Sequence, residues 1–229
     1  FRRVLFRSQQ TLFGIAAAWN PKAALWSNGR RHWRQKVSAA LDPAKKRIWV
    51  HVASLGEFEQ ARPVIEQVSS KYPHNELLLT FFSPSGFELR KNYEKADHVF
   101  YLPADLPRNA KDFIELANPS LVIFIKYEFW FNYLHLLHKK GVPTLLVSAA
   151  FMRDHAFFQW WGGFFRRMLA YYDILFVQDE HNRKLLEEIG IRERVVVAGD
   201  TRYDRVLSIA AAARKIPEIE TFCHRHSRS

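Results

Sequence analysis

The chain has 229 residues, 48% of them hydrophobic and 25% charged, and this composition excludes a disordered protein. The single cysteine, Cys223, excludes an internal disulfide, and no Cys/His cluster has the spacing of a zinc site. The net charge of +11 is concentrated near the N-terminus, because residues 1–50 hold 11 lysines and arginines against one acid, Asp42.

Residues 1–47 combine this charge with an apolar run, Thr11 to Trp19, and with the aromatic residues Phe1, Phe6, Phe13, Trp19, Trp26 and Trp33. A basic and aromatic segment favours an anionic membrane surface, and a solvated basic tail is the alternative. The run is too short to span a bilayer. Nucleic-acid binding is not expected, because no recognised module is present. Because the chain begins at Phe1 and not at a methionine, we expect a longer parent protein or an incomplete gene product, and any signal at the true N-terminus would lie outside this sequence.

Apolar, strand-like runs alternate with amphipathic, helix-like segments after residue 47. The expected strands are 48–53, 77–82, 98–102, 121–125, 143–148, 174–178 and 194–198, and the expected helices lie near 58–71, 85–95, 107–117, 129–140, 156–171 and 180–189. This alternation predicts an α/β fold: one Rossmann-like domain over 48–205, with a mostly parallel sheet and helices on both faces. Residues 206–229 are expected to begin an interdomain linker and tail. No Gly-x-Gly-x-x-Gly motif and no Walker A loop follows a strand.

The stretch from Ile48 to Pro63 carries a carboxylate, Glu57, at the point where the first strand gives way to a helix. Ser54 and Glu57 have the spacing of a capping box, so Glu57 could serve only to cap backbone amides. A functional Glu57 would instead face the sheet edge, where partial desolvation raises its pKa and lets it accept a proton from a hydroxyl. The spacing leaves both interpretations open.

Three other strand-end loops carry polar residues. Ser83 to Gly86 could let a backbone approach a ligand closely, and the same residues are ordinary turn formers. Lys126 to Trp130 places a cation and the acid Glu128 directly beyond a buried strand, which indicates a second site or an ion pair at a helix N-terminus. Arg202 could bind an anionic sugar or phosphate, or could pair with Asp204.

Residues 155–172 hold eight aromatic side chains and the adjacent arginines Arg166 and Arg167. Some of these rings must pack on the sheet, but not all can do so at helical spacing. The surplus favours a second membrane-facing element, and packing against the N-terminal segment is the competing explanation.

The chain resembles the N-terminal half of the 3-deoxy-D-manno-octulosonic acid (Kdo) transferases of lipid A biosynthesis. The resemblance runs from about Trp19 to Ile219, and it is carried in order by NPKAALWSNGR, WVHVASLGEFEQARP, SPSGFE, YLPADLP, KYEFWFNYL and AGDTRYDRV. Several separate motifs in the right order are far more specific than any one of them.

The resemblance implies the N-terminal domain of a GT-B glycosyltransferase that moves Kdo from CMP-Kdo to lipid IVA at the cytoplasmic face of the inner membrane, with inversion, no metal and no cofactor. It implies Glu57 as the general base and assigns Lys126 and Arg202 to transition-state stabilisation. The residues expected to bind substrate are Ser54, Gly56, Ser83, Ser85, Glu128 and Thr201. The implied partners are CMP-Kdo, lipid IVA and an anionic membrane surface.

The sequence departs from the family pattern at two of these positions. Many members have an acid where Lys126 stands, so Glu128 keeps the remaining acid of that motif, and many have a lysine where Arg202 stands. The resemblance also implies a nucleotide-binding second half that this chain lacks, so we expect an acceptor-binding domain that does not turn over alone. The alternative is a non-catalytic lipid-binding module in which Glu57 only caps its helix.

Overall fold

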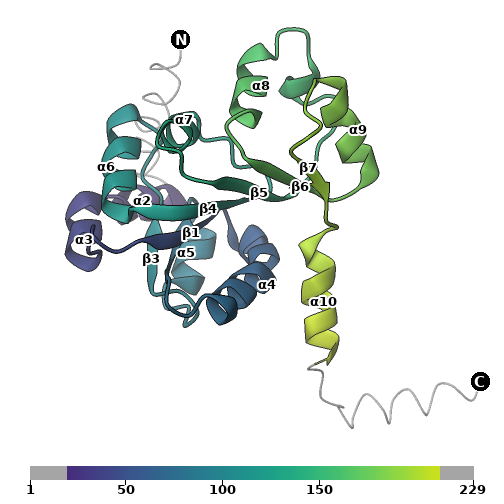
Figure 1. Ribbon diagram of the computed structural model, residues 1–229. Helices are drawn as coiled ribbons and strands as arrows, with labels where there is room; N and C mark the ends of the chain where they lie inside the picture. Colours follow the sequence, from purple (N-terminus) through teal and green to yellow (C-terminus); the bar gives the residue numbers. More distant parts are fainter. Residues whose placement is uncertain (1–19, 212–229) are drawn as a thin grey trace, which may run out of the picture.

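A computed structural model describes residues 20–211, and its strands form one parallel sheet in the order β3-β2-β1-β4-β5-β6-β7 (Figure 1). The strands are β1 (Arg47–Val52), β2 (Glu76–Phe81), β3 (His98–Tyr101), β4 (Pro119–Ile125), β5 (Thr144–Ala149), β6 (Ile174–Val177) and β7 (Val195–Val197). Each matches an expected strand to within two residues at either end. Such continuous apolar runs are typical of strands buried on both faces, as β1 is, whereas the edge strand β7 is partly exposed.

The helices, labelled as in Figure 1, connect these strands or flank the sheet. They are α2 (Pro21–Gly29), α3 (Trp33–Ala40), α4 (Leu55–Lys71), α5 (Pro84–Arg90), α6 (Pro107–Ala117), α7 (Phe131–Lys139), the 3₁₀ turn η1 (Ala156–Phe158), α8 (Gly163–Leu169), α9 (Glu180–Glu188) and α10 (Thr201–Ala211). The predicted Rossmann-like α/β fold is confirmed. The domain boundaries stay predictions, and α10 runs across the one placed between residues 205 and 206.

The two faces of the sheet bury separate apolar clusters. Helices α4 and α5 cover one face, over Val50, Val52 and Phe81. Helices α3, α6, α7, α8 and α9 cover the other, over Trp49 and Phe124. Because successive side chains of a strand point to opposite faces, His51 shares the α6 and α7 face with Trp49. This alternation aims a buried histidine away from α4 and under the loop that follows β4.

Helices α2 and α3 overturn part of the membrane interpretation of the N-terminal segment. Trp26 and Trp33 are both buried, and Trp33 belongs to the cluster beneath α6. The two aromatic rings therefore stabilise this domain and do not face a membrane. The other residues of that interpretation, Phe1, Phe6, Phe13 and the run Thr11 to Trp19, lie outside the described residues.

The expected helix over 156–171 is interrupted, and the structure divides it into η1 and α8. Gly162 begins the second piece, where a Cβ atom would lie 2.0 Å from the carbonyl oxygen of Ala156. Arg166 Nη1 donates to the carbonyl oxygens of Phe157 and Gln159, which satisfies backbone groups of the turn. Six of the eight rings expected here are buried or half-buried: Phe157, Phe158, Phe164, Phe165, Tyr171 and Tyr172. Internal packing thus accounts for most of the aromatic surplus.

Candidate functional site at the switch point of the sheet

The strand order creates a topological switch point beside β1. The chain passes from β1 outward to β2 and β3, and it then returns to place β4 on the other side of β1. The connections after β1 and β4 lead to helices on opposite faces, and open α/β sheets bind ligands where two such connections diverge. We call the loops 53–57 and 126–130 together the switch-point edge.

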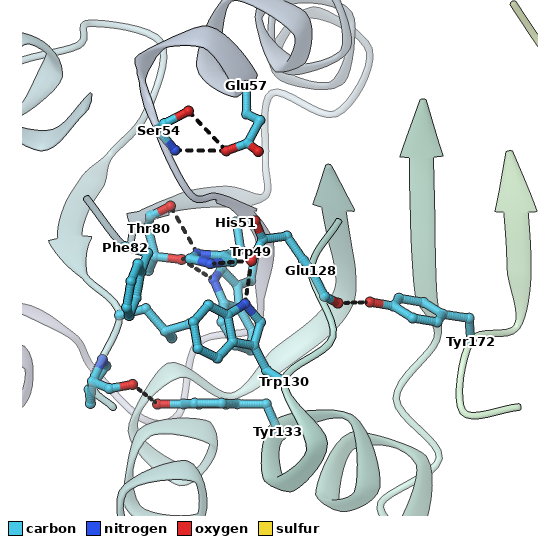
Figure 2. Close-up of polar contacts among 12 residues, drawn as sticks. Trp49, His51, Ser54, Glu57, Thr80, Phe82, Glu128, Trp130, Tyr133 and Tyr172 are labelled. Carbon is cyan, nitrogen blue, oxygen red and sulfur yellow. Dashed lines mark hydrogen bonds and ion pairs between the residues drawn. The ribbon is translucent and has the colours of Figure 1, made fainter. Parts of the chain in front are cut away.

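Glu57 lies in the first turn of α4 and accepts two hydrogen bonds from Ser54. The backbone amide of Ser54 donates to Glu57 Oε2 at 2.8 Å, and its hydroxyl donates to the same oxygen at 3.1 Å (Figure 2). Capping geometry is therefore present. Within the described residues no hydrogen bond reaches Oε1, so the cap leaves one carboxylate oxygen for another proton donor.

The environment of Glu57 favours the protonated acid. Burial raises the pKa of Glu57, and the nearby charge of Glu128 raises it further. The hydrogen bonds from Ser54 and the charge of His51 act in the opposite direction but do not outweigh burial. A carboxylate whose pKa is raised towards neutrality has a greater affinity for a proton, which is the property a general base needs.

The loop after β2 packs against the turn that carries Ser54. The amide of Ser83 donates to the carbonyl oxygen of Ala53 at 2.7 Å, and the hydroxyls of Ser83 and Ser85 lie 3.0 Å apart. A Cβ atom on Gly86 would lie 2.4 Å from the Phe81 ring and 3.0 Å from the Ser54 backbone, so only glycine allows this approach. Ser83 thus contacts the turn that precedes Glu57, whereas Gly56 is exposed and its position leaves room for a side chain.

The loop after β4 turns its acid inward. Glu128 is only 3% exposed, and its Oε2 lies 3.2 Å from His51 Nε2. The Trp130 indole also donates to that oxygen. The expected alternative of an ion pair between Lys126 and Glu128 is wrong, because Glu128 pairs with His51. Its burial fits a residue that positions the loop better than one that contacts substrate.

Lys126 forms no ion pair with Glu128 within the described part of the chain. Its backbone adopts the left-handed conformation, with φ at 71°, and its ammonium group lies 5.7 Å from the centre of the Tyr127 ring. Non-glycine residues adopt this conformation at a cost and concentrate at functional sites. The charge of Lys126 also acts on Asp200, which follows β7.

Arg202 pairs with Asp200 and not with Asp204. Its Nε donates to Asp200 Oδ2 at 2.7 Å, and its amide donates to Oδ1 at 3.0 Å. Burial acts to raise the pKa of Asp200, but the bonds from Arg202 and the charges of Arg202 and Lys126 lower it. The Arg202 side chain is 62% exposed and so is open to a ligand. The hydroxyl of Thr201 is buried and has no partner among the described residues.

Two buried groups near this edge were not among the predicted site residues, although Arg30 ends the motif NPKAALWSNGR and Asp105 lies in YLPADLP. Arg30, directly after α2, donates to the carbonyl oxygens of Leu102 and Phe82, which follow β3 and β2, and burial lowers its pKa to about 9. Asp105 accepts the first amides of α7, at 3.1 Å from Asn132 and 3.2 Å from Tyr133. Arg30 anchors α2 to the strand ends, and Asp105 fixes the helix that follows residues 126–130.

Two further properties bear on ligands and membranes. No cluster of His, Cys, Asp and Glu suited to a metal ion occurs in the described part of the chain. Among residues 20–211 no helix is both long and apolar enough to cross a bilayer. Trp160 and Trp161, in the turn before α8, are 91% and 53% exposed and are the two rings of segment 155–172 that project from the domain.

Solved structures with the same fold place the chain in a structural class. UDP-GlcNAc 2-epimerase from Neisseria meningitidis aligns with a TM-score of 0.57 over 78% of this chain and 53% of its own, at 16% identity. UDP-GlcNAc 2-epimerase from Methanocaldococcus jannaschii aligns with a TM-score of 0.56 over 78% of this chain and 52% of its own, at 14% identity. At this identity the likeness shows the fold alone, which is the Rossmann-like fold of a GT-B N-terminal domain.

The sequence comparisons identify the family. The family model described as 3-deoxy-D-manno-octulosonic-acid transferase (kdotransferase) matches residues 30–205, and the chain belongs to this family. The 3-deoxy-D-manno-octulosonic acid transferase of Haemophilus influenzae is 30% identical over 71% of this chain and 39% of its own length. The 3-deoxy-D-manno-octulosonic acid transferase of Aquifex aeolicus is 35% identical over 48% of this chain and 30% of its own length. The chain thus spans less than two fifths of the length of these relatives.

Proposed function

We propose that this chain is the acceptor-binding part of a glycosyltransferase that moves Kdo from CMP-Kdo to lipid IVA. The observation that carries the proposal is Glu57: a half-buried carboxylate at the switch point, with a raised pKa and one oxygen left uncapped. Family membership over residues 30–205 supports the transfer of Kdo. The donor, the acceptor and the mechanism belong to the proposal.

In the proposed reaction Glu57 acts as the general base. Its Oε1 takes the proton of an acceptor sugar hydroxyl as that oxygen attacks the anomeric carbon of Kdo and CMP leaves from the opposite face, which inverts the configuration. Arg202 pairs with Asp200, and the charge of Lys126 acts on the same carboxylate. In this proposal the two cations supply positive charge for the negative charge that develops on the leaving nucleotide. No step requires a metal ion.

A second candidate function is favoured by the hydrogen bonds of Ser54. Both of its donors reach Glu57 Oε2, as in a helix cap without a chemical role. In that case the domain would be a non-catalytic lipid-binding module. The two functions differ in whether the Glu57 carboxylate is needed for turnover, which a substitution to glutamine decides.

We also propose that the domain docks on the cytoplasmic face of the inner membrane. Trp160, Trp161 and Met152 are exposed, and the exposed arginines Arg153 and Arg167 lie in the same segment. Aromatic and apolar side chains beside arginines suit the interface of an anionic bilayer. Docking there would bring the switch-point edge to a lipid acceptor.

The experiment is a transfer assay with CMP-Kdo and lipid IVA. One sample contains this chain alone, and another contains a chimera in which the chain replaces the matched part of the Haemophilus influenzae relative. We expect an inverted Kdo–lipid product from the chimera, unaffected by EDTA, and none from the chain alone. A folded chimera that binds CMP-Kdo yet forms no product would contradict the proposed acceptor role, and inhibition by EDTA would contradict the metal-free mechanism.

A further inference from the structure

A row of buried polar groups runs beneath the switch-point edge from β2 to β1. The Trp49 indole donates to Thr80 Oγ1 at 2.7 Å, and that hydroxyl lies 2.8 Å from His51 Nδ1. The carbonyl oxygen of Thr80 lies 3.1 Å from the same nitrogen (Figure 2). All three side chains are fully buried. Such groups are tolerated in a core only when they are paired, so the row fixes the His51 ring.

The other nitrogen of His51 faces Glu128. Nε2 lies 3.2 Å from Glu128 Oε2, within ion-pair distance but without hydrogen-bond geometry, and this oxygen accepts the indole hydrogen of Trp130 (Figure 2). The hydroxyl of Tyr172, which precedes β6, donates to the backbone carbonyl of Glu128. A buried carboxylate is costly without partners of this kind. Glu128 thus connects the loop after β4 to β1 and to the segment before β6.

The pair also acts on Glu57. The negative charge of Glu128 raises the pKa of Glu57 and the charge of His51 lowers it, and Ser54 supplies hydrogen bonds that also lower it. Glu128 approaches from the loop after β4 and His51 from β1, so the two elements that flank the switch point both contribute. Ser54 belongs to the turn that carries Glu57 itself.

We propose that His51 and Glu128 are a positioning pair that couples the two loops of the switch-point edge and so sets how Glu57 meets the acceptor. Neither residue is placed against substrate, because both are buried. The inference rests on the proposed role of Glu57 as the base. In this proposal Glu128, the acid retained in residues 126–130, positions the loop and does not bind substrate.

The test follows the titration of Glu57 by carboxyl carbon NMR in the full chain, a measurement that needs no turnover. Replacing Glu128 with glutamine removes a negative charge, so we expect the Glu57 midpoint to move to lower pH. His51→Gln removes the opposing contribution and is expected to move the midpoint to higher pH. Glu66→Gln, on the same helix but paired with Arg62 at the surface, should leave it unchanged.

Hydrogen exchange provides an independent readout of the coupling. Trp130→Phe keeps an aromatic ring and removes one donor to Glu128, so residues 126–130 should exchange faster while the far end of β4 stays protected. This variant perturbs the core less than loss of a buried charge, and circular dichroism checks that each variant is folded. In the chimera, Glu128→Gln should lower kcat with little change in KM. It should also move the acidic limb of the kcat–pH profile to lower pH.

The outcomes separate the pair from the reaction. Opposite shifts of the Glu57 midpoint in the two variants support the positioning pair, even if the transfer assay fails and the proposed reaction falls with it. An unchanged midpoint in folded Glu128→Gln and His51→Gln, together with unchanged exchange of residues 126–130 in Trp130→Phe, would overturn the pair, even if the chimera transfers Kdo.

Discussion

At the scale of single residues, the proposed mechanism assigns the helix cap and the base to different oxygens of Glu57. Ser54 donates to Oε2, and among the described residues no hydrogen bond reaches Oε1. The Ser54–Glu57 spacing was enough to predict the cap, because a capping box is a local pattern. The partner of His51 could not be predicted in the same way. Glu128 lies 77 positions further along the chain and reaches His51 only because β4 returns beside β1.

Asp105 provides a pH-dependent test of the contacts that fix α7. Burial raises the pKa of Asp105 to about 6, although bonds from the amides of Asn132 and Tyr133 act to lower it. The folded state therefore holds this proton more tightly than the unfolded state, in which the pKa is about 3.9. The contribution to the free energy of unfolding is fully present below about pH 4 and is lost as pH rises through about 6.

We accordingly expect the stability of the wild type, measured by urea unfolding relative to Asp105→Asn, to fall between pH 4 and pH 7. The two pKa values limit the change to about 3 kcal/mol. A difference that grows with pH would show that the amide hydrogen bonds outweigh burial at this carboxylate.

At the scale of elements, the strands and most helices were predictable, and α6 has the predicted ends, but helix α2 and the break within 156–171 were not predicted. Buried parallel strands are continuous apolar runs, which the sequence displays directly. Helix α2 was assigned to a membrane surface because basic and aromatic residues lead to that interpretation when only composition is considered. Arg30 changes the assignment by bonding to two strand-end carbonyls. The break at Gly162 depends on contact with the Ala156 carbonyl, which periodicity does not reveal.

Two glycines near Glu57 offer a matched test of how α5 meets the β1–α4 turn. Gly86→Ala should destabilise the fold by about 1–3 kcal/mol, because its Cβ would overlap the Phe81 ring and crowd the Ser54 backbone. Gly56→Ala should be neutral or slightly stabilising, because the nearest atom lies 4.0 Å away and alanine favours a helix. Thermal unfolding of both variants checks this, and equal effects would contradict the packing described.

At the scale of the whole molecule, the proposed membrane-docking surface is formed by the exposed tryptophans and the exposed arginines near them in the chain. Trp160 and Trp161 project from the domain, while the other rings of segment 155–172 are covered. The sequence indicated that segment 155–172 has more aromatic side chains than the core can hold, but it did not indicate which of them are exposed. The break between η1 and α8 determines which rings face inward. Of the eight aromatic side chains in segment 155–172, only Trp160 and Trp161 are exposed.

We expect the chain to sediment with vesicles of anionic phospholipid at low salt and to be released as salt rises. Trp160→Ser with Trp161→Ser should weaken sedimentation without changing the unfolding temperature, because both side chains are exposed. Phe164→Tyr, which alters a half-buried ring of α8, is the matched control. Binding that is insensitive both to salt and to the tryptophan substitutions would remove the docking proposal.

The most direct test of the central claim is the rate of Kdo transfer by the chimera carrying Glu57→Gln. Glutamine still accepts the hydrogen bonds of Ser54, so the cap and the fold persist while the base is lost. We predict a fall in kcat of about 100- to 10,000-fold with an unchanged unfolding temperature, whereas Glu66→Gln on the same helix keeps the full rate. A Glu57→Gln chimera that transfers Kdo at the wild-type rate would show that Glu57 is only a helix cap.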